Sequence, residues 1–213
     1  MGRILLYAAG MFAAVAAGVV LYLELNSGQA PSLPASRIQA TVISNPRSLE
    51  PFTLHDHKGE PFTLSSLQGK WTFLNFGYTY CPDVCPTTLA TLAQLNAGLE
   101  KNGVEAPYQF VFVSIDPERD TQERLADYVP YFSPGFIGVR GEDGDLRKIT
   151  GQLGVLYIRV EEKGNTGEEY LMDHTASVIL IDPEGRFRAV FSAPHNASAM
   201  LKDFRLIASI DTR

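Results

Sequence analysis

The residues best suited to chemistry are the only two cysteines of the chain, Cys81 and Cys85, in the stretch Gly-Tyr-Thr-Tyr-Cys-Pro-Asp-Val-Cys-Pro. Two cysteines this close form one site rather than a framework of disulfides. At the start of a helix a thiol has a lowered pKa, because the helix dipole favours the thiolate. Thiolates prefer Cu(I), zinc or iron–sulfur clusters, and one pair is too few for a closed four-ligand zinc site. A metal site here therefore needs a third ligand from elsewhere in the chain.

The best candidate for the third ligand is His174, in the stretch Asp173-His174-Thr175 shortly before the predicted strand 177–181. We expect it in a loop that abuts the cysteine turn, because sites in α/β sheets gather beyond the strand ends. Two sulfurs and one imidazole can bind both oxidation states of copper, with Asp173 or a backbone carbonyl orienting the ring. Two nearby cysteines alone are more often a redox pair or plain core residues. Their combination with His174 favours the metal site.

Other polar residues are weaker candidates. His55 and His57 would point the same way on an extended strand and could form a secondary metal site, but a solvated hairpin tip is the simpler interpretation. His195 is expected on the surface at the start of the last helix. The stretch 116–120 (Asp-Pro-Glu-Arg-Asp) is expected to be a loop and helix cap with proline and acid in the first turn, with partner docking as the alternative.

From residue 41 onward the pattern predicts an α/β domain with a thioredoxin-like (peroxiredoxin-like) fold. Leucines at positions 89, 92, 95 and 99 follow the spacing of an amphipathic helix. The continuous apolar run 108–115 is typical of a central strand buried on both faces. The predicted strands are 52–54, 62–64, 71–78, 108–115, 136–139, 177–181 and 187–191, and the predicted helices are 87–99, about 120–131, 142–152 and 197–210.

Composition limits the classes of function. The chain has 213 residues, of which 45% are hydrophobic and 20% charged, as in an ordinary globular protein. The net charge is −6 and no basic run is present, which argues against nucleic acid as a partner.

The N-terminal residues 4–23 contain no charged side chain. Twenty helical residues rise about 30 Å, the thickness of the hydrocarbon core of a bilayer. We therefore expect a membrane anchor at 1–25, a linker at 26–40 and a thioredoxin-like copper-binding domain at 41–213. Arg3 before the span favours a cytoplasmic N-terminus, hence a single-pass inner-membrane protein with its soluble domain in the periplasm. A cleaved signal peptide is the alternative.

Three motifs together resemble the Sco/SenC family of copper chaperones in cytochrome c oxidase assembly. They are G-Y-T-Y-C-P-D-V-C-P, V-S-I-D-P-E-R-D-T, and D-H-T followed by S-V-I-L-I-D-P-E-G, and the resemblance covers residues 41–210. It implies a membrane-tethered thioredoxin-like domain with one copper ion, Cu(I) or Cu(II), held by Cys81, Cys85 and His174. It also implies cytochrome c oxidase subunit II or another copper protein as partner, besides a periplasmic copper donor and a thiol reductant.

The resemblance does not choose between delivery of copper and reduction of the cysteines in that oxidase site. We expect a metallochaperone rather than an enzyme, with a thiol–disulfide oxidoreductase as the alternative. Thioredoxin-type enzymes usually have two residues between their cysteines, whereas three intervene here. No cysteine has the usual surroundings of a peroxidatic residue. His174 favours the chaperone, because a dithiol oxidoreductase has no need of a third soft-metal ligand.

Overall fold

The structure, a computed structural model, describes residues 15–22, 38–161 and 170–211. The chain divides into two units, Met1–Arg37 and Ile38–Arg213. In the first unit residues 15–22 are helical, and most of the expected membrane span 4–23 lies outside the described residues. Within the described ranges, no helix combines the length and the apolar character needed to cross a bilayer.

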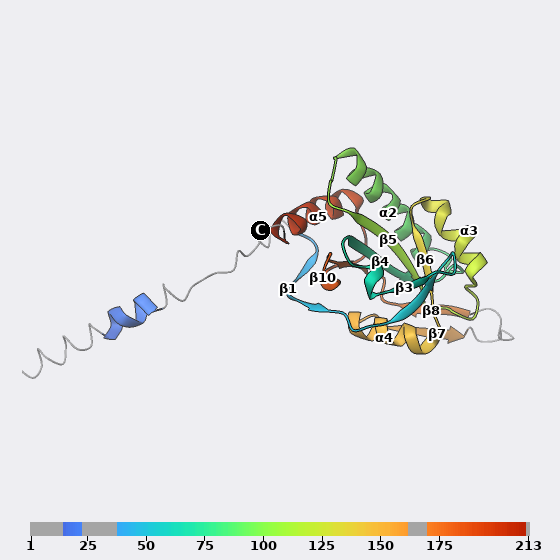
Figure 1. The fold of residues 1–213 in the computed structure, drawn as a ribbon, viewed down its shortest axis with the longest axis horizontal. Helices are drawn as coiled ribbons and strands as arrows, with labels where there is room; N and C mark the ends of the chain where they lie inside the picture. Colours follow the sequence, from blue (N-terminus) through green and yellow to red (C-terminus); the bar gives the residue numbers. More distant parts are fainter. Residues whose placement is uncertain (1–14, 23–37, 162–169, 212–213) are drawn as a thin grey trace, which may run out of the picture. The chain divides into compact units, whose positions relative to one another are not determined.

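Eight strands of the second unit form one mixed sheet in the order β1–β10–β9–β4–β5–β6–β2–β3 (Figure 1). The central strands β4, β5 and β6 run parallel, and their neighbours β9 and β2 run antiparallel to them. Every residue of β4 is buried, as expected of a strand covered on both faces. The strands are β1 (Thr41–Ser48), β2 (Thr53–Asp56), β3 (Pro61–Thr63), β4 (Trp71–Gly77), β5 (Tyr108–Ser114), β6 (Ile137–Arg140), β9 (Val178–Ile181) and β10 (Arg186–Phe191).

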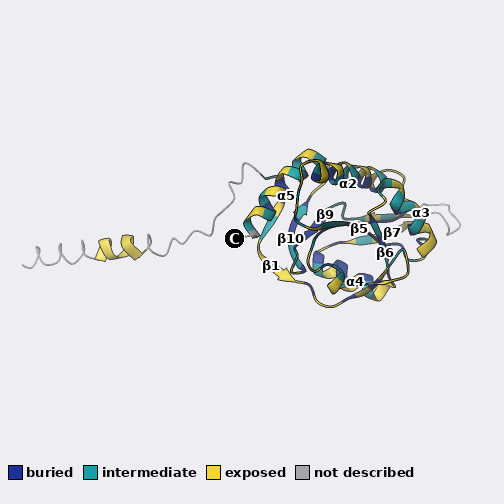
Figure 2. Ribbon diagram, turned by 45° about the horizontal axis from the view of Figure 1, so that its top comes forward, coloured by how far each residue is buried: buried dark blue, intermediate teal, exposed yellow. Residues whose placement is uncertain are grey.

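Helices cover both faces of this sheet (Figure 2). On one face lie α2 (Val84–Lys101), α3 (Gln122–Phe132) and α5 (Ala197–Asp211), and on the other lies α4 (Asp143–Leu153). The predicted leucine stripe of α2 faces the core, where its members are at most 1% exposed. A short 3-10 helix, η2 (Leu64–Ser66), follows β3. The described domain thus has the predicted architecture of a sheet between helical layers.

A second, two-stranded sheet consists of β7 (Tyr157–Glu161) and β8 (Tyr170–His174). Neither strand was predicted, and β1 was also missed. Apolar residues lie on both faces of the small sheet, since Tyr157 is next to Ile158 and Leu171 is next to Met172, so its sequence lacks the alternation that marks a half-buried strand. The expectation that His174 lies in a loop is wrong, since it is the last residue of β8.

Candidate metal centre

The two cysteines lie where β4 passes into α2. Cys81 precedes the helix by three positions, and Cys85 is its second residue. The backbone N–H of Cys85 donates to Sγ of Cys81 at 3.4 Å, so the first turn of the helix holds the sulfur of the preceding loop. Cys81 is half-buried and Cys85 is buried, and they form no disulfide.

A glycine makes room for the buried cysteine. A Cβ atom on Gly77 would lie 2.7 Å from Sγ of Cys85 and 2.9 Å from the ring of Phe112. The last residue of β4 must therefore lack a side chain, because any side chain there would displace the sulfur of Cys85. This is a steric requirement, because Gly77 does not have a positive φ angle.

His174 approaches the cysteines from β8. Its Nε2 atom lies 3.6 Å from Sγ of Cys85, and its Nδ1 atom lies 3.2 Å from the carbonyl oxygen of Thr175. With the proton on Nδ1, the ring donates to that carbonyl and leaves the lone pair of Nε2 facing the sulfur. The rings of Tyr78 and His174 pack edge to face, with 6.3 Å between their centroids. A backbone carbonyl therefore orients the ring, one of the two alternatives expected from the sequence.

The two thiols have opposite pKa shifts. Hydrogen bonding from Cys85, assisted by His174, lowers the pKa of Cys81 from its ordinary 9.0 to about 3. The same contact, together with burial, raises the pKa of Cys85. The site at neutral pH therefore holds one thiolate on the accessible cysteine and one thiol on the buried cysteine.

The loop that carries Cys81 is held in place by hydrogen bonds to the buried side chain of Asp120. Its carboxylate accepts hydrogen bonds from the backbone N–H of Thr79 at 3.0 Å, from the Thr79 hydroxyl at 2.6 Å and from the Ser114 hydroxyl at 2.6 Å. Burial raises the pKa of Asp120. Because Thr79 is two residues before Cys81, these bonds position the loop that carries the thiolate.

A second buried carboxylate, Asp116, connects the 116–120 loop to β8. It accepts from Arg119 Nε at 2.6 Å and from the Tyr170 hydroxyl at 2.6 Å. The Arg119 guanidinium also donates to the Tyr170 carbonyl and lies 3.5 Å from the centre of the Tyr170 ring. The expected loop and helix cap at 116–120 is thus wrong in part. Asp116 and Asp120 are both buried and accept hydrogen bonds from neighbouring side chains, and Thr121 caps α3 instead.

Sequence reasoning did not single out Asp120, Arg119 and Tyr170 as individual residues. The first two belong to the motif V-S-I-D-P-E-R-D-T, which was noted, but only the fold shows that its two aspartates are buried. Tyr170 carries no signal of its own in the sequence. Its role depends on the position of β8, which brings Tyr170 into contact with Asp116 and Arg119.

The remaining histidines lie apart from this site. His57 accepts a hydrogen bond from the Gly138 backbone N–H at 2.9 Å, so it ties β2 to β6 rather than occupying a solvated tip. His55 is exposed on β2 opposite Arg140. His195 is half-buried rather than a surface residue, and burial lowers its pKa.

The three predicted ligands suit a single soft metal ion. Metal–sulfur and metal–nitrogen bonds of about 2.3 and 2.0 Å at a tetrahedral angle separate the two donor atoms by roughly 3.5 Å. The distance between Cys85 Sγ and His174 Nε2 is 3.6 Å, so these two atoms are spaced as ligands of one ion would be. Within the described ranges, no three Cys, His, Asp or Glu side chains already form a group that could hold an ion. Closing the site therefore needs a side-chain adjustment, and Cys81 is the less buried of the two cysteines.

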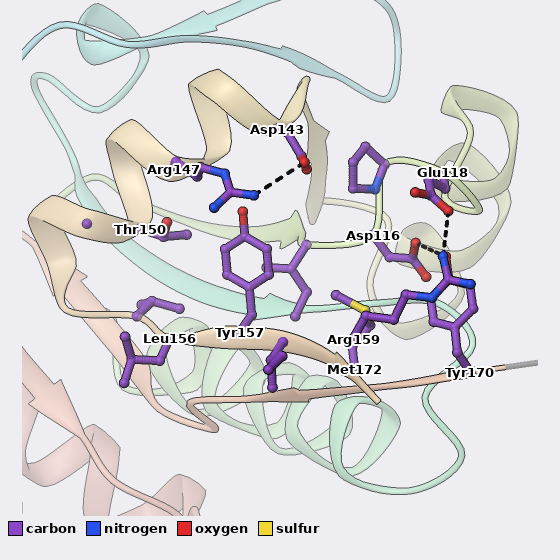
Figure 3. A pocket seen from close by; sticks show the side chains of 15 residues that line it. Asp116, Glu118, Asp143, Arg147, Thr150, Leu156, Tyr157, Arg159, Tyr170 and Met172 are labelled. Carbon is purple, nitrogen blue, oxygen red and sulfur yellow. Dashed lines mark hydrogen bonds and ion pairs between the residues drawn. The ribbon is translucent and has the colours of Figure 1, made fainter. Parts of the chain in front are cut away.

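A cavity of about 470 Å³ lies beside the site, between α4 and the β7–β8 hairpin (Figure 3). Tyr157 and Met172 project into it from the hairpin. Two ion pairs lie in its wall. Arg147 lies 3.6 Å from Asp143, and Arg159 of β7 lies 3.1 Å from Glu118 of the 116–120 loop. The cavity contains none of the three predicted ligands, so it is distinct from the candidate metal centre.

Comparison with known proteins finds relatives over most of this chain. The family model described as SCO1/SenC matches residues 41–209. A putative copper-binding protein of Stutzerimonas stutzeri is 35% identical over 158 residues, which cover 73% of this chain and 76% of that protein. Copper-bound ScoI of Arabidopsis thaliana is 32% identical with a TM-score of 0.69 over 78% of this chain and 100% of the other. Copper-bound ScoI of Bradyrhizobium japonicum is 34% identical with a TM-score of 0.66 over 76% and 99%.

The family match spans nearly the whole described domain, including both cysteines and His174. The relatives share the fold as well as the sequence. This chain therefore belongs to the SCO1/SenC family.

Proposed function

We propose that this chain binds one copper ion through Cys81, Cys85 and His174, and delivers it to, or prepares, the dinuclear copper site of cytochrome c oxidase subunit II. The observation that carries the proposal is the 3.6 Å approach of His174 Nε2 to Cys85 Sγ. Two relatives with this fold were solved with copper bound, which supports copper as the cargo. Two sulfurs and one imidazole also favour copper over zinc, because a closed zinc site needs a fourth ligand.

Each ligand has a defined part in binding. Cys81 offers a thiolate that is already formed at neutral pH. Cys85 must lose its proton when the metal arrives, so binding releases a proton and weakens in acid. His174 offers Nε2 while its Nδ1–H remains bonded to the Thr175 carbonyl.

The second candidate function is a thiol–disulfide oxidoreductase, which the split pKa values favour. An accessible thiolate beside a buried thiol suits a nucleophile and a resolving residue. The Cys81 thiolate would attack one sulfur of an acceptor disulfide, and Cys85 would then displace the reduced acceptor. The Cys81–Cys85 disulfide forms, and two electrons pass to the acceptor cysteines.

The deciding experiment mixes the chain with a soluble fragment of oxidase subunit II and follows copper and thiols separately. A chaperone transfers copper to the reduced fragment, and His174→Ala abolishes this transfer while leaving the disulfide chemistry intact. A reductase instead reduces the oxidised fragment without copper and tolerates the loss of His174. If His174→Ala restores oxidase assembly in cells as well as the parent does, the reductase replaces the chaperone.

We further propose that the chain is a single-pass protein of the inner membrane with this domain in the periplasm. The uncharged run 4–23 and Arg3 before it support this placement. An oxidising compartment also suits a cysteine pair that cycles between dithiol and disulfide.

A further inference from the structure

The outward face of the β7–β8 hairpin is apolar. Leu156 and Ile158 are 77% and 64% exposed, and Val160 and Leu171 are 40% and 41% exposed. We call these four residues the hairpin stripe. Val160 and Leu171 are direct cross-strand partners, and the alternation of β7 places Ile158 on the same face.

Such a face is unusual for a small sheet at a protein surface. An antiparallel sheet with one face against its domain normally presents polar residues to water. Here the intervening residues of β8 are more buried than the stripe, so the other face of the hairpin packs against the domain. Adjacent exposed aliphatic side chains of this kind mark interaction sites.

The stripe is continuous with the candidate metal centre. A shallow, open groove of about 450 Å³ is lined by Leu156, Tyr157, Ile158, Asp173, His174 and Thr175. Two stripe residues and one proposed copper ligand therefore share one concave surface. Anything that fills this groove lies directly against His174.

The cysteine side of the centre is also bordered by exposed apolar groups. Tyr80, next to Cys81, is 48% exposed, and Val84, next to Cys85, is 44% exposed. Arg119 and Arg124 lie over the Tyr80 ring at 5.0 and 4.6 Å, which holds that ring in place. The centre is thus flanked by exposed apolar side chains on both its cysteine and its histidine side.

If the ion passes directly to another protein, that acceptor protein is the molecule that must occupy this groove. An incoming ligand must come within bonding distance of the ion before the old ligands leave, so the acceptor must cover the residues around His174. An apolar rim excludes water from that contact, as the surroundings of interface hot spots do. The Asp173 carboxylate, exposed opposite Ile158, has no hydrogen bond or ion pair with any described residue. It can pair with a basic group across the interface.

We infer that the hairpin stripe is the docking surface for the protein that accepts copper from this centre, and that this partner presents an apolar surface with a basic group opposite Asp173. The inference rests on the proposed delivery of copper.

The test uses the full-length chain loaded with Cu(I) and two acceptors, the reduced subunit II fragment and a small Cu(I) chelator. Ile158→Lys places a charge in the centre of the stripe. It should slow transfer to the protein fragment about tenfold or more, the cost of losing one interface hot spot. Copper stoichiometry and transfer to the chelator should remain parental, because Ile158 is not a copper ligand.

Tyr131→Lys is the matched control, since Tyr131 is 86% exposed on α3 and does not line the groove. It should leave both transfer rates unchanged. If the parent binds copper but passes none to the fragment, the proposed delivery fails, and the inference fails with it. If the parent delivers copper and Ile158→Lys delivers it equally fast, the docking surface alone is refuted. A parental dimer that Ile158→Lys converts to a monomer assigns the stripe to a second copy of this chain and also overturns the inference.

Discussion

Nε2 of His174 lies 3.6 Å from Sγ of Cys85, although 89 positions separate the two residues in the chain. The pair is brought together because β8 ends beside the start of α2. The hydrogen bond network around Asp120 and Asp116 holds both sides of this contact, since one aspartate bonds the cysteine loop and the other bonds Tyr170 of β8.

Loss of any one proposed ligand should weaken copper binding by about a hundredfold or more, because even the partners of metal ligands are worth ten- to a hundredfold. Competition with a Cu(I) chelator measures this for Cys81→Ser, Cys85→Ser and His174→Ala. His55→Ala is the control, since His55 is exposed on β2. An affinity of His174→Ala equal to that of the parent would falsify the three-ligand site.

The two cysteines should react at very different rates in the reduced, metal-free chain. The pKa of Cys81 is lowered to about 3, so its thiolate is present at pH 6, whereas Cys85 is buried and its pKa is raised. Iodoacetamide at pH 6 should therefore label Cys81 first, as peptide mass spectrometry can show. Cys85→Ala removes the main donor to that thiolate and should move the pH dependence of labelling toward an ordinary thiol. Preferential labelling of Cys85 would contradict the assignment.

Gly77→Ala should displace Cys85 and disturb the centre. The added Cβ would lie 2.7 Å from Sγ of Cys85, and overpacking of this kind costs about 1–3 kcal/mol in the free energy of unfolding. Copper affinity should fall as well, because the sulfur must move. Gly151→Ala is the control, since Gly151 is inside α4 with nothing within 4 Å of its Cβ position, and it should be neutral or stabilising. Equal stability and affinity of parent and Gly77→Ala would show that the site adapts freely.

Asp120 should make the stability of the metal-free chain depend on pH. Burial raises its pKa above the ordinary 3.8, so the folded chain binds this proton more tightly than the unfolded chain. From about pH 4 upward, the free energy of unfolding of the parent should fall relative to that of Asp120→Asn, until the folded pKa is passed. Urea titrations over a pH series measure this difference. Asp127→Asn, exposed on α3, is the control and should leave the pH dependence of the parent unchanged. If the free energy of unfolding of the parent instead rises with pH relative to that of Asp120→Asn, the prediction is refuted.

The placement in the membrane can be tested with reporters fused after Arg213. A reporter that is active only outside the cytoplasm should be active, because Arg3 before the uncharged run keeps the N-terminus inside. Activity of a reporter that works only in the cytoplasm would contradict this topology. Recovery of a soluble form that begins near Pro31 would instead indicate cleavage of a signal peptide.

The sequence by itself predicted seven of the eight strands of the main sheet, the helices α2 to α5 and the three proposed ligands of the centre. The leucine spacing of α2 and the apolar runs of β4 and β5 are local patterns, and local periodicity reports which face of an element is buried. Cys81, Cys85 and His174 could be named because their residue types are rare in this chain and stand beside recognisable element ends. Their chemistry follows from residue type before any fold is known.

Only the tertiary structure decided the surroundings of these residues. The hairpin that carries His174 was missed because apolar residues lie on both of its faces, as Tyr157 and Ile158 do, so its sequence has no clear alternation of apolar and polar residues. The roles of Asp120 and Tyr170 depend on burial and on contacts across 41 and 54 positions, which no local pattern encodes. The opposite pKa shifts of the two cysteines likewise arise from the hydrogen bond between their side chains and from the deeper burial of Cys85, and only the folded chain sets this contact and this burial.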